Sequence, residues 1–264
     1  MKSLKDKTVW ITGASSGIGE ALAYEMARAG AKVILSARNE EELHRVRKNC
    51  ASWEKHIVIP LDLEKYHQLK NKAEEVWEQH GPIDVLINNG GVSQRYLAAD
   101  AEVETDEKIL NVNFFGAIAL THPILKKMLE RNSGHFVVIS SMLGLYGIQA
   151  RSAYSASKHA LKGYFESLRN ELVKTGVRVT IVYPGYIKTQ ISKHALIANG
   201  TAYGKADKAH MTAIPPEHCA QRIRGAIEED KPELIIAGTK EKLGLLVSRF
   251  LPSLFRRLTP KIEV

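Results

Sequence analysis

Two serines, a tyrosine and a lysine stand close together in SSMLGLYGIQARSAYSASK, residues 140–158. Tyr154 and Lys158 are four residues apart, and on a helix such positions share one face. A free tyrosine loses its proton at about pH 10, which suits acid–base chemistry at neutrality poorly. An ammonium group about 5 Å away, at an effective dielectric of about 20, favours the phenolate by roughly 3 kcal/mol. The pair therefore predicts a tyrosine that transfers a proton at neutral pH.

A serine at the end of a predicted strand would complete this chemistry. Ser141 would donate a hydrogen bond to a substrate oxygen beside Tyr154 and stabilise the charge that grows there. Ser140 is the alternative, because strand alternation sends the two hydroxyls to opposite faces. A purely structural alternative is that one face of this helix packs in the core, with Tyr154, Leu161, Phe165, Leu168 and Leu172 as its buried side chains. Lys158 lies on the same face and argues against this alternative, since lysine is seldom buried without a task.

The elements that would position these residues alternate along the chain. Most apolar runs are continuous, as expected for strands covered on both faces, and we predict strands at 8–12, 32–37, 56–61, 83–88, 135–140, 178–183 and 233–237. Helical patterns lie between them, at 18–29, 40–50, 64–80, 103–130, 152–175 and 216–229. This order predicts a doubly wound α/β fold, with helices on both faces of a parallel sheet. No linker interrupts the series, so we predict a single domain.

The first predicted strand runs into TGASSGIG, residues 12–19, whose glycines precede a helix. Gly13, Gly17 and Gly19 would let the backbone approach a pyrophosphate, whose charge would lie at the helix N-terminus. The alternative is a turn that needs glycine only for its backbone angles. The glycine-rich stretch lies after the first strand and before an Ala-rich helix, and this position favours a nucleotide site.

The second predicted strand is followed by Arg38, with no acidic residue at its tip. An acidic residue there usually binds the ribose hydroxyls of NAD. A guanidinium instead binds a 2′-phosphate through charge-assisted hydrogen bonds, and the missing carboxylate removes a repulsive partner. We therefore predict NADP(H) as the cofactor. The alternative is a surface arginine paired with Glu40, Glu41 or Glu42.

Further ligand contacts are predicted where later strands end. Asp62 would accept a hydrogen bond from the adenine amino group, and the turn at 89–91 would pass beneath the adenosine ribose. Both are equally compatible with ordinary turn chemistry. The segment 184–215 is too long for a plain connection and follows the sixth strand, at the edge where open α/β sheets bind ligands.

Six motifs stand in order: TGASSGIG, NNGG (88–91), NVNFFG (111–116), ISS (139–141), YSASK (154–158) and PGYIKT (184–189). With them, about residues 5–240 resemble the short-chain dehydrogenase/reductase family. The resemblance implies a seven-stranded Rossmann-type sheet, a nicotinamide cofactor and a catalytic set, namely Asn113, Ser141, Tyr154 and Lys158. Asn113 would help hold a water chain from the lysine to solvent. A structural amide is a compatible alternative.

The resemblance also implies nucleotide contacts. Lys158 would bind the ribose, and Ile187 and Thr189 would contact the nicotinamide carboxamide, although Thr189 would equally cap a helix. NNGG departs from the family, in which alanine more often precedes the last glycine. The full predicted set is Gly13, Ser15, Ser16, Gly17, Ile18, Gly19, Arg38, Asp62, Leu63, Asn89, Gly90, Gly91, Tyr154, Lys158, Pro184, Gly185, Ile187 and Thr189.

The substrate is expected to be a small-molecule ketone, aldehyde or secondary alcohol. Its pocket walls are expected at 93–96, at 143–149 and in a loop at 186–215. The stretches NNGGVSQR and SASKHALKGYFESLR resemble the branch containing hydroxysteroid- and retinoid-type reductases, which implies a lipophilic substrate. The family also implies a homo-oligomer, a dimer or tetramer, formed through helices 103–130 and 152–175.

Composition excludes several classes of protein. Hydrophobic content of 44% and charged content of 25% exclude a disordered chain. The formal net charge of +8 comes without a nucleic-acid-binding motif, so no nucleic acid partner is predicted. Two distant cysteines and ten unclustered histidines predict no disulfide framework and no metal site. With no signal segment or long apolar run, a reducing, cytoplasmic location is expected.

Residues 241–264 form a basic amphipathic tail after a catalytic domain at 1–240. Such a segment suits peripheral contact with an anionic membrane surface or packing on a neighbouring subunit. The whole pattern predicts an NADP(H)-dependent oxidoreductase. The alternative is a non-catalytic dinucleotide-sensing regulatory or scaffold protein on the same fold, which would be expected to lose the tyrosine or the lysine.

Overall fold

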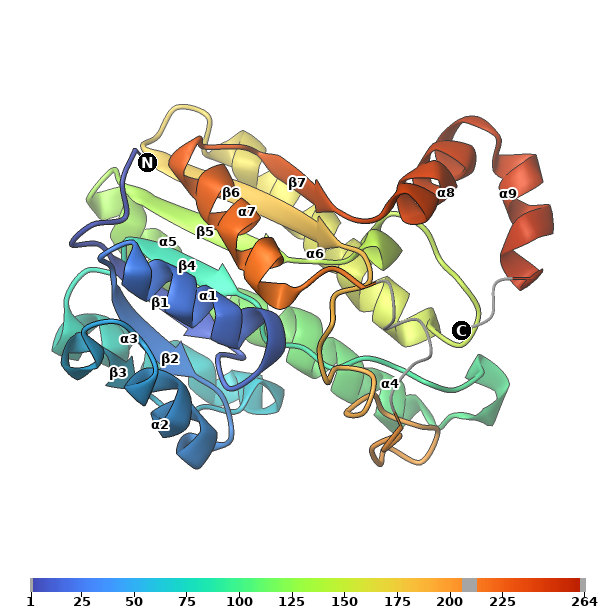
Figure 1. Ribbon diagram of the computed structural model, residues 1–264, viewed down its shortest axis with the longest axis horizontal. Helices are drawn as coiled ribbons and strands as arrows, with labels where there is room; N and C mark the ends of the chain where they lie inside the picture. The colour runs from blue at the N-terminus through green and yellow to red at the C-terminus, as the bar shows by residue number, and fades with distance from the viewer. Residues whose placement is uncertain (1, 206–212, 262–264) are drawn as a thin grey trace.

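The strands form one sheet in the order β3-β2-β1-β4-β5-β6-β7, and every neighbouring pair is parallel. A computed structural model describes residues 2–205 and 213–261 (Figure 1). The strands are β1 (Thr8–Thr12), β2 (Lys32–Ser36), β3 (Ile57–Val58), β4 (Val85–Asn88), β5 (Gly134–Ile139), β6 (Val177–Pro184) and β7 (Glu233–Ile236). The predicted α/β fold is confirmed. The strand order reverses at β1 and β4, which is where such sheets open a crevice for ligands.

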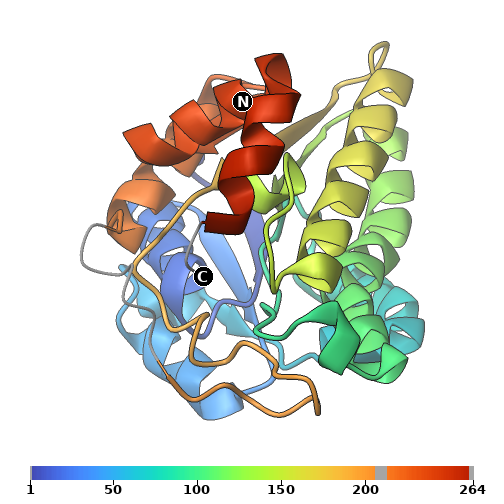
Figure 2. The same cartoon turned by 90° about the vertical axis from the view of Figure 1, so that its right-hand side faces the viewer.

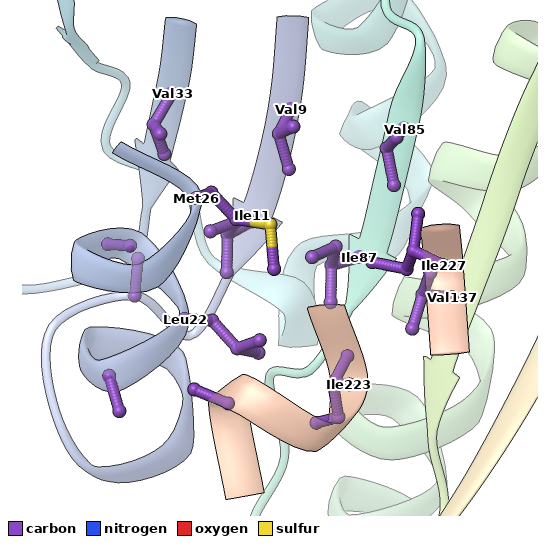
Figure 3. Close-up of a cluster of buried hydrophobic side chains, with 14 of the residues drawn as sticks. Val9, Ile11, Leu22, Met26, Val33, Val85, Ile87, Val137, Ile223 and Ile227 are labelled. Atoms are coloured by element: carbon purple, nitrogen blue, oxygen red, sulfur yellow. The ribbon is translucent and has the colours of Figure 1, made fainter. Parts of the chain in front are cut away.

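Helices cover both faces of the sheet. They are α1 (Gly17–Arg28), α2 (Glu40–Lys48), α3 (Leu69–His80), α4 (Val103–Leu110), α5 (Gly116–Glu130), α6 (Ser152–Glu171) and α7 (Pro216–Glu228). Buried side chains of α1, α2 and α7 pack on one face of the sheet, and those of α3, α5 and α6 pack on the other. Figure 3 shows the first of these clusters, in which Leu22 and Met26 of α1 and Ile223 of α7 meet strand residues.

The apolar runs of the sequence become strands because both of their faces are buried. All residues of β1, β4 and β5 are buried. Within β1, Val9 and Ile11 face the cluster of α1 and α7, whereas Trp10 faces the cluster on the opposite side. Alternate residues thus serve different helix layers, which removes the polar alternation typical of a half-exposed strand.

Three predicted elements differ from the structure by more than a shift of one end. The strand predicted at 56–61 pairs regularly only over β3, although Ile59 and Leu61 still donate to the carbonyl oxygens of Leu35 and Ala37 at 2.9 and 3.1 Å. The helix predicted at 103–130 is divided into α4 and α5 by a π-helical turn, Asn111–Phe115. The helix predicted at 64–80 begins as a 3-10 helix, Leu63–Gln68, before α3.

The C-terminal tail folds into two further helices, α8 (Thr239–Phe250) and α9 (Pro252–Leu258). α8 begins just before the predicted boundary at residue 241. Parts of two predicted segments lie outside the described residues: 206–212 of the substrate loop and 262–264 of the tail. Cys50 and Cys219 are both buried free thiols.

Candidate active site

The turn after β1 packs directly against the turn after β4. Asn89 donates from its side chain to the carbonyl oxygens of Thr12 (2.9 Å) and Gly13 (3.3 Å). The Thr12 hydroxyl accepts from the backbone N–H groups of Asn89 and Gly90. A Cβ added at Gly19 would come within 2.1 Å of the Gly13 oxygen. The two turns therefore fit together only because their backbones approach without side chains between them.

These turns open into a cavity of about 1220 Å³ at the carboxyl ends of the strands. Ser16 precedes α1 and makes no side-chain capping bond, so the first N–H groups of the helix remain for an anion. The size and this backbone cradle fit a dinucleotide. The predicted nucleotide contacts that line the cavity are Gly13, Ser15, Ser16, Gly17, Ile18, Arg38, Asp62, Leu63, Asn89, Gly90, Gly91, Tyr154, Lys158, Pro184, Gly185, Ile187 and Thr189. Gly19 lies behind the turn and does not line it.

One end of the cavity carries two arginines. Arg38 is exposed there, and no ion pair of residues 2–205 or 213–261 includes it. Glu42, an alternative partner for Arg38, instead pairs with Arg45 at 2.8 Å. Arg45 also pairs with Glu20 at 2.7 Å. The sequence interpretation missed Arg45, because its contact with Glu20 joins residues 25 positions apart in different helices.

Ser141 and Tyr154 meet on the cavity wall. The Ser141 side chain acts to lower the pKa of Tyr154, and its hydroxyl accepts from the N–H of Leu143 at 3.1 Å. Ser140 points elsewhere, since its hydroxyl donates to the carbonyl oxygen of Lys158 at 3.0 Å. This arrangement favours Ser141 over Ser140 as the partner of the tyrosine.

Lys158 lies below the tyrosine ring rather than at its hydroxyl. Its Nζ is 5.7 Å from the centre of the Tyr154 ring and donates to the carbonyl oxygen of Ile139 at 2.9 Å. Burial lowers the pKa of Lys158 to about 8, because the ammonium is removed from water. The lysine is therefore able to exchange a proton near neutral pH.

The pKa of Tyr154 differs from the sequence-based expectation. Burial raises it above its usual value, while the hydrogen bond with Ser141 and the positive charge of Arg151 act to lower it. Lys158 was expected to make the phenol more acidic, but burial is the largest influence on the pKa of Tyr154 in the structure. Arg151 is one nearby cation that favours the phenolate.

Asn113 lies in the π-helical turn and is fully hydrogen-bonded. Its Oδ1 accepts from the N–H of Val92 at 2.7 Å, and its Nδ2 donates to the Val92 carbonyl and the Ser157 hydroxyl. A Cβ added at Gly91 would lie 3.0 Å from Asn113 Oδ1 and 3.5 Å from Lys158 Nζ. The amide therefore has the structural bonds of the alternative interpretation and also lies next to the lysine.

A second feature that the sequence interpretation missed joins the segment after β4 to the first turn of α6. Gln94, fully buried, accepts at Oε1 from the N–H of Tyr154 at 3.0 Å and donates from Nε2 to Ser152 and to the carbonyl of Tyr96. Its own carbonyl oxygen accepts a short hydrogen bond from Arg151. Although expected in the pocket wall, Gln94 instead fixes the backbone that carries Tyr154.

The fold and this site define a class of protein. A family model described as short chain dehydrogenase matches residues 7–199, and the chain belongs to this short-chain dehydrogenase/reductase family. Its members are oxidoreductases that use nicotinamide nucleotides, and this chain is accordingly an oxidoreductase of that family.

Individual relatives agree with this assignment. "Dehydrogenase/reductase SDR family protein 7-like" of Anopheles gambiae is 42% identical, over 96% of this chain and 82% of the relative. "Dehydrogenase/reductase SDR family member 7B" of Mus musculus is 36% identical, over 97% and 80%. A short-chain dehydrogenase from Streptomyces avermitilis has a solved structure that covers 97% of this chain and 95% of its own, with 29% identity and a TM-score of 0.79. The predicted resemblance is confirmed.

Proposed function

We propose that the protein is an NADP(H)-dependent oxidoreductase that interconverts a ketone or aldehyde and an alcohol. The observation that carries the proposal is that Ser141, Tyr154 and Lys158 together line the wall of a cavity that also holds the glycine turn. The nicotinamide nucleotide, when bound, supplies or accepts the hydride. The turn at 13–19 would hold its phosphates and Lys158 its ribose.

The side chains of this site transfer the proton and position the substrate and the backbone. In reduction, Tyr154 donates its proton to the substrate oxygen, and in oxidation it takes that proton back. Ser141 donates a hydrogen bond to the same oxygen and fixes its position beside the phenol. In reduction, Lys158, whose pKa burial lowers to about 8, replaces the proton that Tyr154 has given to the substrate. Asn113 fixes the backbone of Val92 beside Lys158.

The direct test is NADPH oxidation with a panel of ketones and aldehydes. Removing one hydroxyl in Tyr154→Phe removes the proton donor, so we expect kcat to fall by about a thousand-fold. NADPH affinity should stay within about two-fold, because the ring remains in place. Tyr164→Phe is the matched control on the same helix, since its hydroxyl bonds to His122 instead. Equal rates for Tyr154→Phe and wild type would remove the mechanism and favour the non-catalytic alternative.

The preference for NADP(H) rests on Arg38. The exposed guanidinium at the end of β2 has no carboxylate partner among the described residues, which suits a 2′-phosphate. A serine dehydrogenase has been solved in complex with NADP+. It is 26% identical to this chain, with a TM-score of 0.78, and the match covers 87% of this chain and 94% of the dehydrogenase. That relative supports the proposal for this chain.

Replacing Arg38 should separate the two cofactors. We expect Arg38→Asp to weaken NADPH binding by about ten- to a hundred-fold, because a cation that pairs with phosphate becomes a repulsive anion. NADH binding should change little. Lys48→Asp carries the same charge change on an exposed residue at the end of α2. Fluorescence titration measures both affinities, and equal losses for the two nucleotides in Arg38→Asp would contradict the assignment.

A lipophilic substrate remains the prediction for the carbonyl compound. Ile187 and Ile191 supply apolar side chains to the cavity lining, next to the polar side chains of Lys188 and Gln190. The homo-oligomer, the cytoplasmic location and the division of the chain at residue 240 also remain predictions.

A further inference from the structure

The C-terminal helix pair, α8 and α9 (residues 239–258), has no buried residue in either helix. Figure 1 shows the pair beyond the carboxyl end of β7, apart from the helices that cover the sheet, and in Figure 2 the pair faces the viewer. It is nevertheless anchored. Phe255 packs edge-on against Tyr146 with ring centres 5.3 Å apart, and Glu241 accepts from the N–H of Tyr186 at 3.2 Å. The pair therefore has a defined inner side and an outer side.

The outer side is apolar. Leu243, Leu246 and Phe250 follow the spacing that aligns side chains on one face of a helix, while Leu245 packs inward against the core. Leu254 and Leu258 repeat the spacing on α9. The exposed fractions are 59% for Leu243, 54% for Leu246, 70% for Phe250, 55% for Leu251, 43% for Leu254 and 46% for Leu258. Six exposed large apolar side chains within residues 243–258, on and between two helices that contact each other, mark an interaction surface.

The same helix pair carries an excess of positive charge. Its exposed basic residues are Lys240, Lys242, Arg249, Arg256 and Arg257. Glu241 is its acidic residue, and that carboxylate is already bonded to the backbone of Tyr186. Among the described residues, none of the five cations forms an ion pair. The expected partner is therefore both apolar and anionic.

We propose that the C-terminal helix pair docks on an anionic lipid bilayer, with its leucines and Phe250 in the interface and its basic residues at the headgroups. A bilayer supplies both an apolar layer and a sheet of negative charge. A second copy of this chain fits less well, because a symmetric contact would bring five cations against five. None of the helices in the described part of the chain has the length and hydropathy of a membrane span.

Co-sedimentation of the full chain with vesicles tests this proposal. The vesicles are phosphatidylcholine alone, or phosphatidylcholine with phosphatidylserine as about a third of the lipid, at low and physiological ionic strength. We expect binding to the anionic vesicles only, weakened as salt rises. Equal binding to both vesicle types, or to neither, would overturn the proposal.

Substitutions assign the binding to the helix pair. We expect Arg256→Glu with Arg257→Glu to lower the partition coefficient by about ten-fold or more, and Phe250→Ser to lower it by about ten-fold. The control for the double charge reversal is Lys48→Glu with Lys70→Glu, which changes two exposed lysines on α2 and α3. The control for Phe250→Ser is Val173→Ser, after α6, where the valine side chain is 74% exposed. The controls should bind like wild type.

Two further measurements keep the outcome clear. NADPH titration of each variant shows that the fold is retained, and it also separates this proposal from that of the catalytic function, since vesicle binding needs no turnover. Sedimentation velocity without lipid reports the oligomeric state. If Phe250→Ser dissociates an oligomer and no form of the protein binds vesicles, the surface joins copies of the chain and the bilayer proposal is wrong.

Discussion

A Cβ added at Gly19 would come within 2.1 Å of a backbone oxygen, whereas one added at Gly244 of α8 would find its nearest atom, the Tyr146 hydroxyl, 4.0 Å away. Both glycines lie in helices. At the first, the backbones of two turns touch and no side chain fits between them. At the second, an added methyl group meets no such obstacle. The nucleotide cradle, formed by the turns after β1 and β4, is thus tightly packed, whereas the C-terminal helix pair is loosely packed.

This difference reflects what each region contacts. A phosphate cradle works through backbone N–H groups, so the turns after β1 and β4 must be held within a fraction of an ångström. The C-terminal helix pair offers side chains to a soft, extended partner and needs no such fit. Rigid packing therefore belongs to the cradle, and exposed apolar area to the helix pair.

Gly19→Ala gives the largest expected effect on the cradle. The added methyl group must displace the Gly13 carbonyl, so we expect NADPH affinity to fall by about a hundred-fold and the free energy of unfolding by about 1–3 kcal/mol. Fluorescence titration and urea unfolding measure the two quantities.

Gly225→Ala in α7 is the matched control for Gly19→Ala. Its added Cβ would have only the Glu229 carboxylate nearby, at 3.9 Å. We expect unchanged NADPH affinity in this variant. If Gly19→Ala also bound NADPH like wild type, the cradle would tolerate a side chain and the comparison would fail.

Gln94→Ala should have an intermediate effect. It leaves the buried N–H of Tyr154 without its acceptor, which costs about 1–3 kcal/mol of stability. We also expect kcat to fall by about ten-fold with KM nearly unchanged, because the first turn of α6 loses its fixed position. Steady-state kinetics and urea unfolding measure both quantities.

Two variants sharpen that result. Gln94→Glu keeps an acceptor for the Tyr154 N–H and should recover part of kcat. Gln79→Ala, on the exposed surface of α3, should match wild type. A loss of stability in Gln94→Ala without a loss of kcat would show that the residue is structural alone.

Gly244→Ala gives the smallest expected effect, and its sign is opposite. Alanine restricts the unfolded chain more than glycine and meets no clash in α8, so the free energy of unfolding should rise by about 0.5–1 kcal/mol. Vesicle binding and NADPH turnover should not change. Urea unfolding measures the first quantity, and destabilisation would mean that α8 packs more tightly than its exposure indicates.

Much of the fold and of the site was predictable because it is encoded locally. β1 matches its predicted range, since a continuous apolar run is a direct signal of a strand buried on both faces. The spacing of Tyr154 and Lys158 needs only helix geometry. The predicted strand at 56–61 is less exact: regular pairing covers only β3, while Ile59 and Leu61 still donate to the carbonyl oxygens of Leu35 and Ala37.

The sequence by itself determined which chemical groups the protein has and in which order its strands and helices follow. Only the tertiary structure decided how those groups behave. Gln94 bonds to the N–H of a residue 60 positions away, and burial raises the pKa of Tyr154 although a lysine lies one turn below it. Such contacts and such desolvation depend on how the helices and the sheet pack together, and a local pattern of residues does not contain that information.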